Sequence, residues 1–294
     1  MNTEARYKEI VEAMANTETR FDMPDLRDRT VTLDLPDSIS FAGEPVPLHI
    51  PDVRERLDRE IHINRYWHNN SIFLIKRANQ WLPQIEEILI QNNVPSDFKY
   101  LPAIEGGLKN AVSPKQAVGF WQILKPTAKE YGMEVTDEVD ERYDPIKSTV
   151  VACKYLNRAY KKFGNWTLVA ASFNRGMRGV QNSLDAQHVD DYYDLLLNEE
   201  TSRYVFRILA CKDLLEDPAK YNFDIKTEHL YEQELLDTLV VTESIKDLAV
   251  YAKDQGINYK ILKKYNPWLR KSHLTVRNGK SYYLKVPKKN SATG

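Results

Sequence analysis

Glu105 is the residue best placed to act as an acid, because two glycines follow it directly. Paired glycines are natural helix ends, so the segment after Pro95-Ser96 is predicted to form a short helix that stops at Gly106-Gly107. The helix dipole disfavours negative charge at that end, and the apolar neighbours also disfavour the ionised form. Both effects raise the pKa of Glu105. A carboxyl group that stays protonated near neutral pH can act as a general acid.

Polar side chains recur at three later points of the chain, where they could hold a substrate opposite the acid. Ser113 supplies a hydroxyl, and residues 119–122 form a turn that ends in the amide of Gln122. Another predicted helix ends with Asn174 beside a glycine. Glycosidic cleavage needs an acid at the leaving oxygen and a group that stabilises the positively charged sugar. We therefore interpret the set as a glycoside-cleaving site, against the alternative that Glu105 is an ordinary exposed acid.

The order of these residues resembles that of the soluble-lytic-transglycosylase family. The family pattern is a Glu-Ser pair, a later Ser, a Gly-Leu-(Trp/Met)-Gln element and an Ala-Tyr-Asn-x-Gly element. The matching residues here are Glu105-Gly106, Ser113, Gly119-Phe120-Trp121-Gln122 and Ser172-Phe173-Asn174-Arg175-Gly176. Three further stretches resemble the family, namely Arg142–Pro145, Ala152–Leu156 and Glu200–Val205. Several matches in the right order are more specific than one short motif.

The resemblance implies a lysozyme-like fold and a lytic transglycosylase that cleaves peptidoglycan. Glu105 would protonate the glycosidic oxygen between N-acetylmuramic acid and N-acetylglucosamine. It would then deprotonate the muramoyl 6-hydroxyl, which gives a 1,6-anhydro product. The substrate's own 2-acetamido group would stabilise the intermediate, so no second catalytic carboxylate is needed. Gln122, Asn174 and Tyr204 would hold acetamido and hydroxyl groups of the sugar, and Ser113 would bond near the cleaved linkage.

Two residues depart from the family pattern. Gly106 stands where a serine normally follows the catalytic glutamate, and Phe173 stands where a tyrosine normally precedes the asparagine. Both changes remove a polar contact, which predicts slower cleavage or a differently positioned substrate, and Phe173 and Trp121 are expected to pack in the core. Two rival functions stay open. One is a muramidase of the same fold that delivers water to the sugar, and the other is a peptidoglycan-binding scaffold with a weakened active site.

The elements that must position these residues are mostly helical. Apolar residues recur at helical spacing from Val53, and Leu82-Pro83 is predicted to start a second helix. Further helices are predicted at about 97–105, 114–131, 146–163, 166–174, 190–197 and 201–215. Asp144 before Pro145 is predicted to cap the third of these. Strands are hard to find between 60 and 215, so residues 59–225 are predicted to form an all-α catalytic domain.

The segments on either side of this domain have different patterns. Residues 1–58 hold prolines between short alternating stretches, and they are predicted to form an extended segment that packs on the catalytic domain. After a charged linker at 226–236 comes a module at 237–288, and then a tail at 289–294. The module combines strands at 238–241 and 282–287 with helices at 243–254 and 259–265.

This β-α-α-β module resembles the lysin-motif (LysM) module, which binds glycans that contain N-acetylglucosamine. The resemblance rests on the strand Thr238–Val241, the apolar positions of the first helix, and Asn266-Pro267-Trp268-Leu269. It implies that the module binds the wall. The alternative is a small domain that only packs on the enzyme.

Composition and charge favour a globular protein with an uncharged partner. Of the 294 residues, 42% are hydrophobic, and 41 basic residues balance 42 acidic ones to give a net charge of -1. Because no strong field results, no nucleic-acid partner is expected. Peptidoglycan glycan strands are the expected partner. The histidines lack metal-ligand spacing, so neither a metal nor another cofactor is expected.

Cysteines and hydropathy bear on the compartment. Cys153 and Cys211 lie in apolar helical patterns typical of buried free thiols, although one bridge between them stays open. No stretch reaches the roughly 18 apolar residues that a membrane-spanning helix needs. A wall substrate implies the periplasm, and we expect a leader or a lipid-anchored cysteine, absent from this sequence, to tie the protein to the outer membrane.

Overall fold

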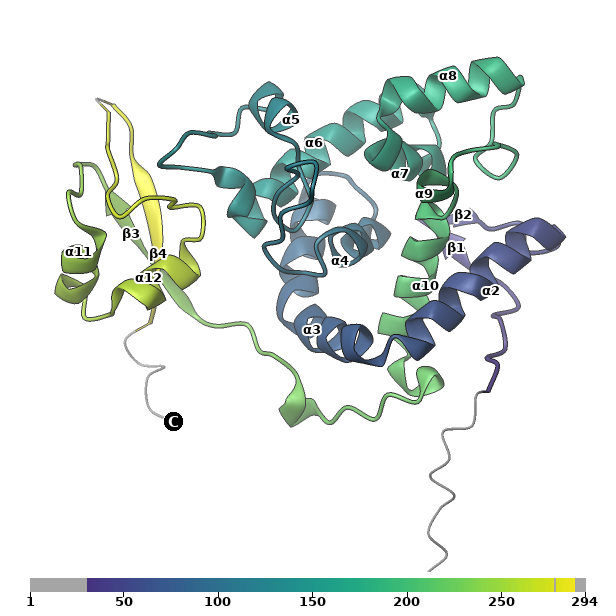
Figure 1. The fold of residues 1–294 in the computed structure, drawn as a ribbon, viewed down its shortest axis with the longest axis horizontal. Helices are drawn as coiled ribbons and strands as arrows, with labels where there is room; N and C mark the ends of the chain where they lie inside the picture. Colours follow the sequence, from purple (N-terminus) through teal and green to yellow (C-terminus); the bar gives the residue numbers. More distant parts are fainter. Residues whose placement is uncertain (1–30, 278, 289–294) are drawn as a thin grey trace, which may run out of the picture. The chain divides into compact units, whose positions relative to one another are not determined.

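The computed structural model describes residues 31–277 and 279–288, and from Leu33 onward these residues belong to one compact unit. The part of the expected extension before residue 31 and the tail at 289–294 lie outside the described residues. The described chain is mainly helical, with one two-stranded sheet near each of its ends (Figure 1). The predicted fold class is thereby confirmed.

The helical domain follows β1 (Ser40–Phe41) and β2 (Glu44–Pro45). Its α-helices, in chain order, are α2 (Pro51–Tyr66), α3 (His68–Gln91), α4 (Leu101–Glu105), α5 (Lys125–Glu130), α6 (Pro145–Phe163), α7 (Trp166–Arg175), α8 (Met177–Gln187), α9 (Glu199–Ser202) and α10 (Tyr204–Glu216). Its short 3-10 helices are η1 (Ser96–Tyr100), η2 (Glu141–Tyr143), η3 (Pro218–Tyr221) and η4 (Thr227–His229).

Helix α10 lies at the centre of this domain, where it packs against α2, α4 and α7 (Figure 1). Apolar side chains occur on nearly every face of the helix, and Val205, Ile208 and Leu209 are fully buried. A helix that is hydrophobic all round belongs inside a domain. The five-residue helix α4 is therefore held against the most buried helix of the protein.

The ends of α6 and α7 follow the local sequence. Asp144 caps α6 by accepting bonds from the backbone amides of Ile146 and Lys147, as predicted, and Gly164 ends that helix with a φ of +64°. Asn165 caps α7 in the same way. Because α7 ends at Gly176, Asn174 lies in its last turn.

Three helix predictions were wrong. Residues 114–131 are helical only at Lys125–Glu130, because Gln116, Gly119 and Gln122 have positive φ values that a right-handed helix excludes. Residues 190–197 form no regular helix, whereas α8 was not predicted. The buried Tyr192 and Leu195 are three residues apart, which imitates one face of a helix.

The third wrong prediction concerns Pro83, which lies inside α3 instead of starting a helix. A proline in a helix interior removes one backbone hydrogen bond. Burial of Leu82, Ile85 and Leu89 on the core side of α3 offsets this loss. At the other end of the domain, α2 begins at Pro51, within the segment that was expected to be extended to residue 58.

The C-terminal module has the predicted order of elements, namely β3 (Leu236–Val241), α11 (Leu248–Asp254), α12 (Tyr259–Tyr265) and β4 (Tyr282–Pro287). Strands β3 and β4 pair antiparallel, with Leu239 opposite Leu284. The first helix starts at Leu248 rather than at residue 243, because Asp247 caps it and Ile245 instead pairs with Leu274. The apolar core of the module also contains Val139 from the helical domain.

Both cysteines are free and buried. Burial raises the pKa of each thiol to about 12. Among the described residues, no helix combines the length and the apolar character needed to cross a bilayer.

Candidate active site

Glu105 is the last residue of α4, as predicted. Gly106 caps the helix, and Gly107 follows with a φ of +61°, a left-handed conformation that favours glycine. Leu101 and Ala103 on the same short helix are buried. The core therefore fixes α4, and α4 in turn fixes the carboxyl group at its end.

The pKa of Glu105 is raised, and burial is the largest cause. The negative charge of Glu200 acts in the same direction, whereas a hydrogen bond from Tyr204 and the positive charge of Arg207 lower the pKa. The Tyr204 hydroxyl donates this bond to Oε1 of Glu105 at 2.6 Å. The predicted direction of the shift is confirmed. Desolvation, rather than the dipole of so short a helix, is its main source.

Glu105 lines a cleft of about 810 Å³, within the range usual for ligand sites. The cleft lies between the segment that follows α4, the junction of α2 and α3, and the segment of α9 and α10. Trp67 at the α2–α3 junction lines the cleft and is 59% exposed. An exposed indole ring beside an acid offers a flat apolar surface to a sugar ring.

Other acids line the same cleft, but each has a partner. Glu60 is buried and forms a bidentate ion pair with Arg203. Glu199 forms ion pairs with Arg59 and Arg203. Glu105 is bonded to a neutral tyrosine instead.

Gln122 lies in the turn of residues 116–123, with an uncommon φ of +45°. Its side-chain amide donates to the backbone oxygens of Gly119 at 2.7 Å and Ala111 at 3.0 Å. Ala111 lines the cleft of Glu105, whereas Gln122 itself lines a second cavity of about 290 Å³. The amide therefore ties the turn to the segment that borders the cleft.

Asn174 lines the same second cavity as Gln122. Its side chain donates to Oε1 of Glu200 at 3.2 Å and accepts from the hydroxyl of Thr201 at 2.8 Å. Glu200 lines the cleft of Glu105. The hydrogen bond from Asn174 to Glu200 therefore links the second cavity to that cleft. The structure thus brings Tyr204 into direct contact with Glu105 and Asn174 into contact with Glu200, whose charge acts on Glu105.

Phe173 packs in the core, as predicted. Its ring lies between those of Trp121 and Tyr155, with centroids 5.9 Å and 5.4 Å away. Trp121 is fully buried and donates to the hydroxyl of Thr149 at 2.9 Å. The Phe173 ring is thus packed against other aromatic rings, although Phe173 directly precedes Asn174.

Ser113 has a local role in the structure. Its hydroxyl accepts from the backbone amide of Ala117 at 3.0 Å, which closes the turn that leads to Gly119. Ser113 is not among the residues that line the cleft of Glu105.

Close packing of backbones explains the glycine that follows Glu105. A Cβ atom at Gly106 would lie 2.8 Å from the backbone oxygen of Gly119 and 2.9 Å from that of Phe120. A Cβ atom at Gly119 would lie only 2.1 Å from the backbone oxygen of Arg142. The turn of residues 116–123 therefore rests directly on the end of α4. A serine at position 106 does not fit this arrangement.

Sequence reasoning missed two charged groups that act on Glu105, namely Glu200 and Arg207. Arg207 also donates to the backbone oxygen of Ile104 at 3.0 Å, which holds the end of α4. Tyr204 and Arg207 are three residues apart on α10 and hence share one face. The three-residue spacing from Tyr204 could have indicated from the sequence that Arg207 lies near Glu105.

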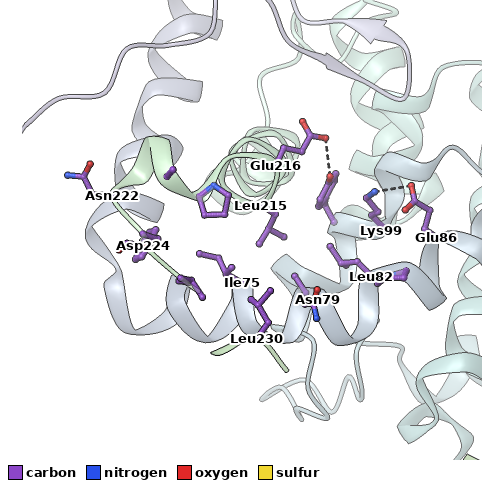
Figure 2. Close-up of a pocket in the computed structure, with 17 residues that line it drawn as sticks. Ile75, Asn79, Leu82, Glu86, Lys99, Leu215, Glu216, Asn222, Asp224 and Leu230 are labelled. Carbon is purple, nitrogen blue, oxygen red and sulfur yellow. Dashed lines mark hydrogen bonds and ion pairs between the residues drawn. The ribbon is translucent and has the colours of Figure 1, made fainter. Parts of the chain in front are cut away.

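Another large cavity, of about 830 Å³, shares no lining residue with the cleft of Glu105 and lies between α3, the end of η1 and the end of α10 (Figure 2). Lys99 pairs with Glu86, and the Tyr100 hydroxyl donates to Glu216. Figure 2 shows these pairs at one side of the cavity, with Ile75, Leu82 and Leu215 among its apolar lining. Because these charged groups are already partnered, the cavity has less to offer to an acid-catalysed reaction than the cleft of Glu105.

Comparison with known proteins agrees with this geometry. Residues 84–195 match the transglycosylase SLT domain, and residues 237–290 match the soluble lytic transglycosylase C-terminal LysM-like domain. The first match contains Glu105, Ser113, Gln122 and Asn174, and the second covers the C-terminal module.

Two relatives align over most of the chain and a third over about a third of it. The membrane-bound lytic murein transglycosylase D of Escherichia coli strain K12 is 28% identical over 261 residues, which is 86% of this chain and 56% of that protein. The protein of the same name from Escherichia coli O6:H1 gives the same values. A protein of Alteromonas sp. strain M-1, named for tributyltin chloride resistance, is 30% identical over 112 residues, 36% of this chain and 54% of that protein.

The chain spans little more than half the length of these relatives. Within that span, one match falls on the helical domain and the other on the C-terminal module, which have separate apolar cores. The chain thus carries a transglycosylase SLT domain followed by a LysM-like domain, and it is a distant homologue of membrane-bound lytic murein transglycosylase D.

Proposed function

We propose that this protein is a lytic transglycosylase that cleaves the glycan strands of peptidoglycan with Glu105 as its single catalytic acid and base. The observation that carries the proposal is the raised pKa of Glu105 in a cleft wide enough for a sugar chain. The match of residues 84–195 to the SLT domain supports it.

The reaction has two proton transfers at one carboxyl group. Protonated Glu105 gives its proton to the glycosidic oxygen between N-acetylmuramic acid and N-acetylglucosamine, and the bond from that oxygen to the anomeric carbon breaks. The 2-acetamido group of the substrate stabilises the electron-poor carbon. The Glu105 carboxylate then takes the proton of the muramoyl 6-hydroxyl, whose oxygen bonds to the anomeric carbon. The product is a 1,6-anhydro end, and Glu105 is protonated again.

The surroundings of Glu105 suit this cycle. The hydrogen bond from Tyr204 stabilises the carboxylate that exists between the two transfers, and burial favours the protonated form before and after them. Glu60 and Glu199 in the same cleft are held in ion pairs with arginines, whereas Glu105 is hydrogen-bonded to the Tyr204 hydroxyl. Within this proposal, Gln122, Asn174 and Ser113 contact or position the sugar.

A muramidase is the second candidate, because Glu200 lies near enough to Glu105 to raise its pKa. A second carboxylate close to the acid could direct a water molecule to the anomeric carbon. In the structure Glu200 accepts a hydrogen bond from Asn174, which is the arrangement expected of a positioning group.

Product analysis separates the candidates. Purified peptidoglycan is digested in oxygen-labelled water by the wild type, by Glu105→Gln and by Glu199→Gln, and the products are analysed by mass spectrometry. We expect unlabelled anhydro ends, at least about 10³-fold slower cleavage by Glu105→Gln, and near-normal cleavage by Glu199→Gln. Labelled reducing ends would identify a muramidase. Sedimentation with peptidoglycan without cleavage by any of the three proteins would identify a binding scaffold.

We further propose that the C-terminal module binds the glycan. The LysM-like match supports this, and a cleft of about 520 Å³ lies along the β3–α11 connection. A wall substrate supports a location in the periplasm, and attachment to a membrane would agree with the name of the Escherichia coli relative. Cell fractionation of the tagged protein tests the location, and recovery with the cytosol would contradict it.

A further inference from the structure

The C-terminal module contacts the helical domain along residues 134–143, which we call the docking segment, and Lys147 adds a cation–π contact with Trp268. Val139 is 1% exposed and belongs to the apolar core of the module, where it pairs with Leu269 as an isolated β-bridge. Without Val139 that core would have a gap. The module is therefore completed by a residue of the helical domain.

Polar contacts surround this apolar one. The backbone amide of Asp140 donates to Trp268 at 2.9 Å, and the amide of Arg270 donates to Glu138 at 2.7 Å. The Glu138 carboxylate accepts from both the amide and the hydroxyl of Thr275, and these bonds are the main reason why the pKa of Glu138 is lowered. The middle of the docking segment is thus fixed on either side of Val139 by groups of the module.

Further contacts extend the interface along the segment. Glu134 forms an ion pair with Lys280 and accepts from the Tyr282 hydroxyl. At the other end, the guanidinium of Arg270 lies 3.9 Å from the centre of the Tyr143 ring, a cation–π contact. The docking segment thus contacts the module near both of its ends as well as at its middle.

The same segment reaches the turn of residues 116–123 through Arg142. Arg142 and Asp140 are both buried and form a bidentate ion pair, with bonds of 2.9 Å and 2.7 Å. The remaining guanidinium nitrogen, Nη1, donates to the backbone oxygens of Gln116 at 3.1 Å and Ile123 at 3.2 Å. These two oxygens lie at the two ends of the turn that holds Gln122.

The turn needs such support, because its own backbone is unfavourable. Gln116 and Gln122 have φ values of +63° and +45°, which non-glycine residues adopt only when their surroundings impose them. Gly119 packs its Cα against the backbone oxygen of Arg142, and the side chain of Asn110 donates to the backbone oxygen of Tyr143. The docking segment thus determines both the shape and the place of the turn.

We infer that the C-terminal module positions the active site: by docking on residues 134–143 it holds Arg142, a positioning residue, which clamps the turn that carries Gln122 beside the end of α4. The inference deepens the proposed function, because it gives the module a role in catalysis in addition to glycan binding. The link runs from Leu269 through Val139, Asp140 and Arg142 to the turn.

The first test measures the turn itself and needs no turnover. Hydrogen exchange is followed in the full chain for the hydrogen-bonded amides of the turn and its flank, namely those of Ala117, Val118, Gly119, Gln122 and Ile123. Val139→Ser opens the docking contact, and Val286→Ser is the matched control, since Val286 lies in the same core but outside the interface. We expect exchange in the turn to be on the order of tenfold faster in Val139→Ser and unchanged in Val286→Ser. Equal exchange rates in the two variants would overturn the inference.

Arg142→Lys separates docking from clamping. Lysine keeps the charge but cannot pair with Asp140 in bidentate fashion and reach both backbone oxygens as well. We expect faster exchange in the turn, with unchanged exchange across the β3–β4 pair. Loosening of the module together with the turn would mean that Arg142 stabilises the whole interface, which would contradict its assigned role.

The second test is kinetic and uses a short, soluble glycan chain. We expect Val139→Ser to lower kcat/KM about tenfold. The loss should be shared between a lower kcat and a higher KM in the same proportion as in Gln122→Ala. In the double variant, Val139→Ser should add little to the loss that Gln122→Ala already causes. A fully additive loss would overturn the inference. If the wild type cleaves no glycan, the proposed function fails, while the exchange measurements still decide whether the module holds the turn.

Discussion

At the scale of single residues, the proton on Glu105 is controlled by groups that act in opposite directions. Burial and the charge of Glu200 raise its pKa, and Tyr204 and Arg207 lower it. Glu105 must be protonated to begin the proposed reaction, so activity is present below this pKa and is lost as the pH rises through it. The alkaline limb of the pH profile therefore reports the balance of these groups.

Two nearly isosteric variants should move this limb in opposite directions. Tyr204→Phe removes the hydrogen bond that stabilises the carboxylate, so the pKa of Glu105 rises and the limb moves to higher pH. Glu200→Gln removes a neighbouring negative charge, so the pKa falls and the limb moves to lower pH. The measurement is kcat/KM against pH for both variants and the wild type. Shifts of the same sign would contradict Glu105 as the titrating acid.

Gly106 is a steric requirement at the same scale. Its φ of -99° is open to any residue, so the obstacle to a side chain is only the backbone of Gly119 and Phe120. We expect Gly106→Ser, although it restores the residue usual in the family, to lower the free energy of unfolding by about 1–3 kcal/mol and to slow cleavage.

Urea denaturation and the cleavage assay measure the two effects of Gly106→Ser. The matched variant is Gly107→Ala, where the nearest atoms are 3.9 Å away and only the positive φ opposes a side chain. That variant is expected to lose about 1–2 kcal/mol from backbone strain and to retain more activity. A fully active and stable Gly106→Ser protein would mean that the turn of residues 116–123 can move to make room for a side chain, which would contradict the steric requirement.

At the scale of elements, helix α7 depends on a residue far away in the chain. The carboxylate of Glu44, the first residue of β2, accepts from the backbone amides of Trp166 and Thr167 at 2.6 Å and 2.8 Å. It also accepts from the Thr167 hydroxyl at 2.7 Å. A negative charge at a helix N-terminus is favourable and satisfies amides that have no partner within the helix.

Glu44→Ala is therefore expected to lower the free energy of unfolding by about 1–2 kcal/mol, and Glu44→Gln by less, because the amide keeps one acceptor oxygen. Urea unfolding of both variants gives the comparison. The control is Glu87→Ala, since Glu87 is exposed and bonded only to Gln91 on its own helix, with an expected change within about 0.5 kcal/mol. Equal losses for Glu44→Ala and Glu87→Ala would exclude a capping role.

At the scale of the whole molecule, the two thiols report on global opening. Cys153 is 0% exposed and Cys211 is 2% exposed, and burial raises the pKa of each to about 12. The thiolate is the reactive form. We expect neither thiol to react with an aromatic disulfide reagent in the native protein at about pH 8, and both to react rapidly in denaturant. Rapid reaction of one thiol in the native state would reveal local opening of α6 or α10.

Several features followed from local sequence alone. Gly106-Gly107 determined the end of α4, Asp144 and Pro145 determined the start of α6, and Asn266-Pro267 determined the end of α12. Caps and helix ends depend on residues within one turn of the chain, so sequence specifies them directly. The order of the motif residues also sufficed to indicate a glycoside-cleaving site around Glu105.

Other features depend on contacts between distant segments. The turn of residues 116–123 was predicted to be helical, because nothing in its local pattern reveals that Arg142 clamps both its ends. Pro83 stays within α3 because the core holds the helix on either side of it. In the same way, the pKa of Glu105 depends on Tyr204, Glu200 and Arg207, which lie about a hundred residues further along the chain.

The sequence by itself determined the kinds of elements, the acid and the likeness of the two domains to known families. Only the tertiary structure decided what surrounds the acid and that Val139 completes the core of the module. The physical reason is that burial and electrostatic interactions act through space. Periodicity and capping, in contrast, act along the chain and can be recognised in it.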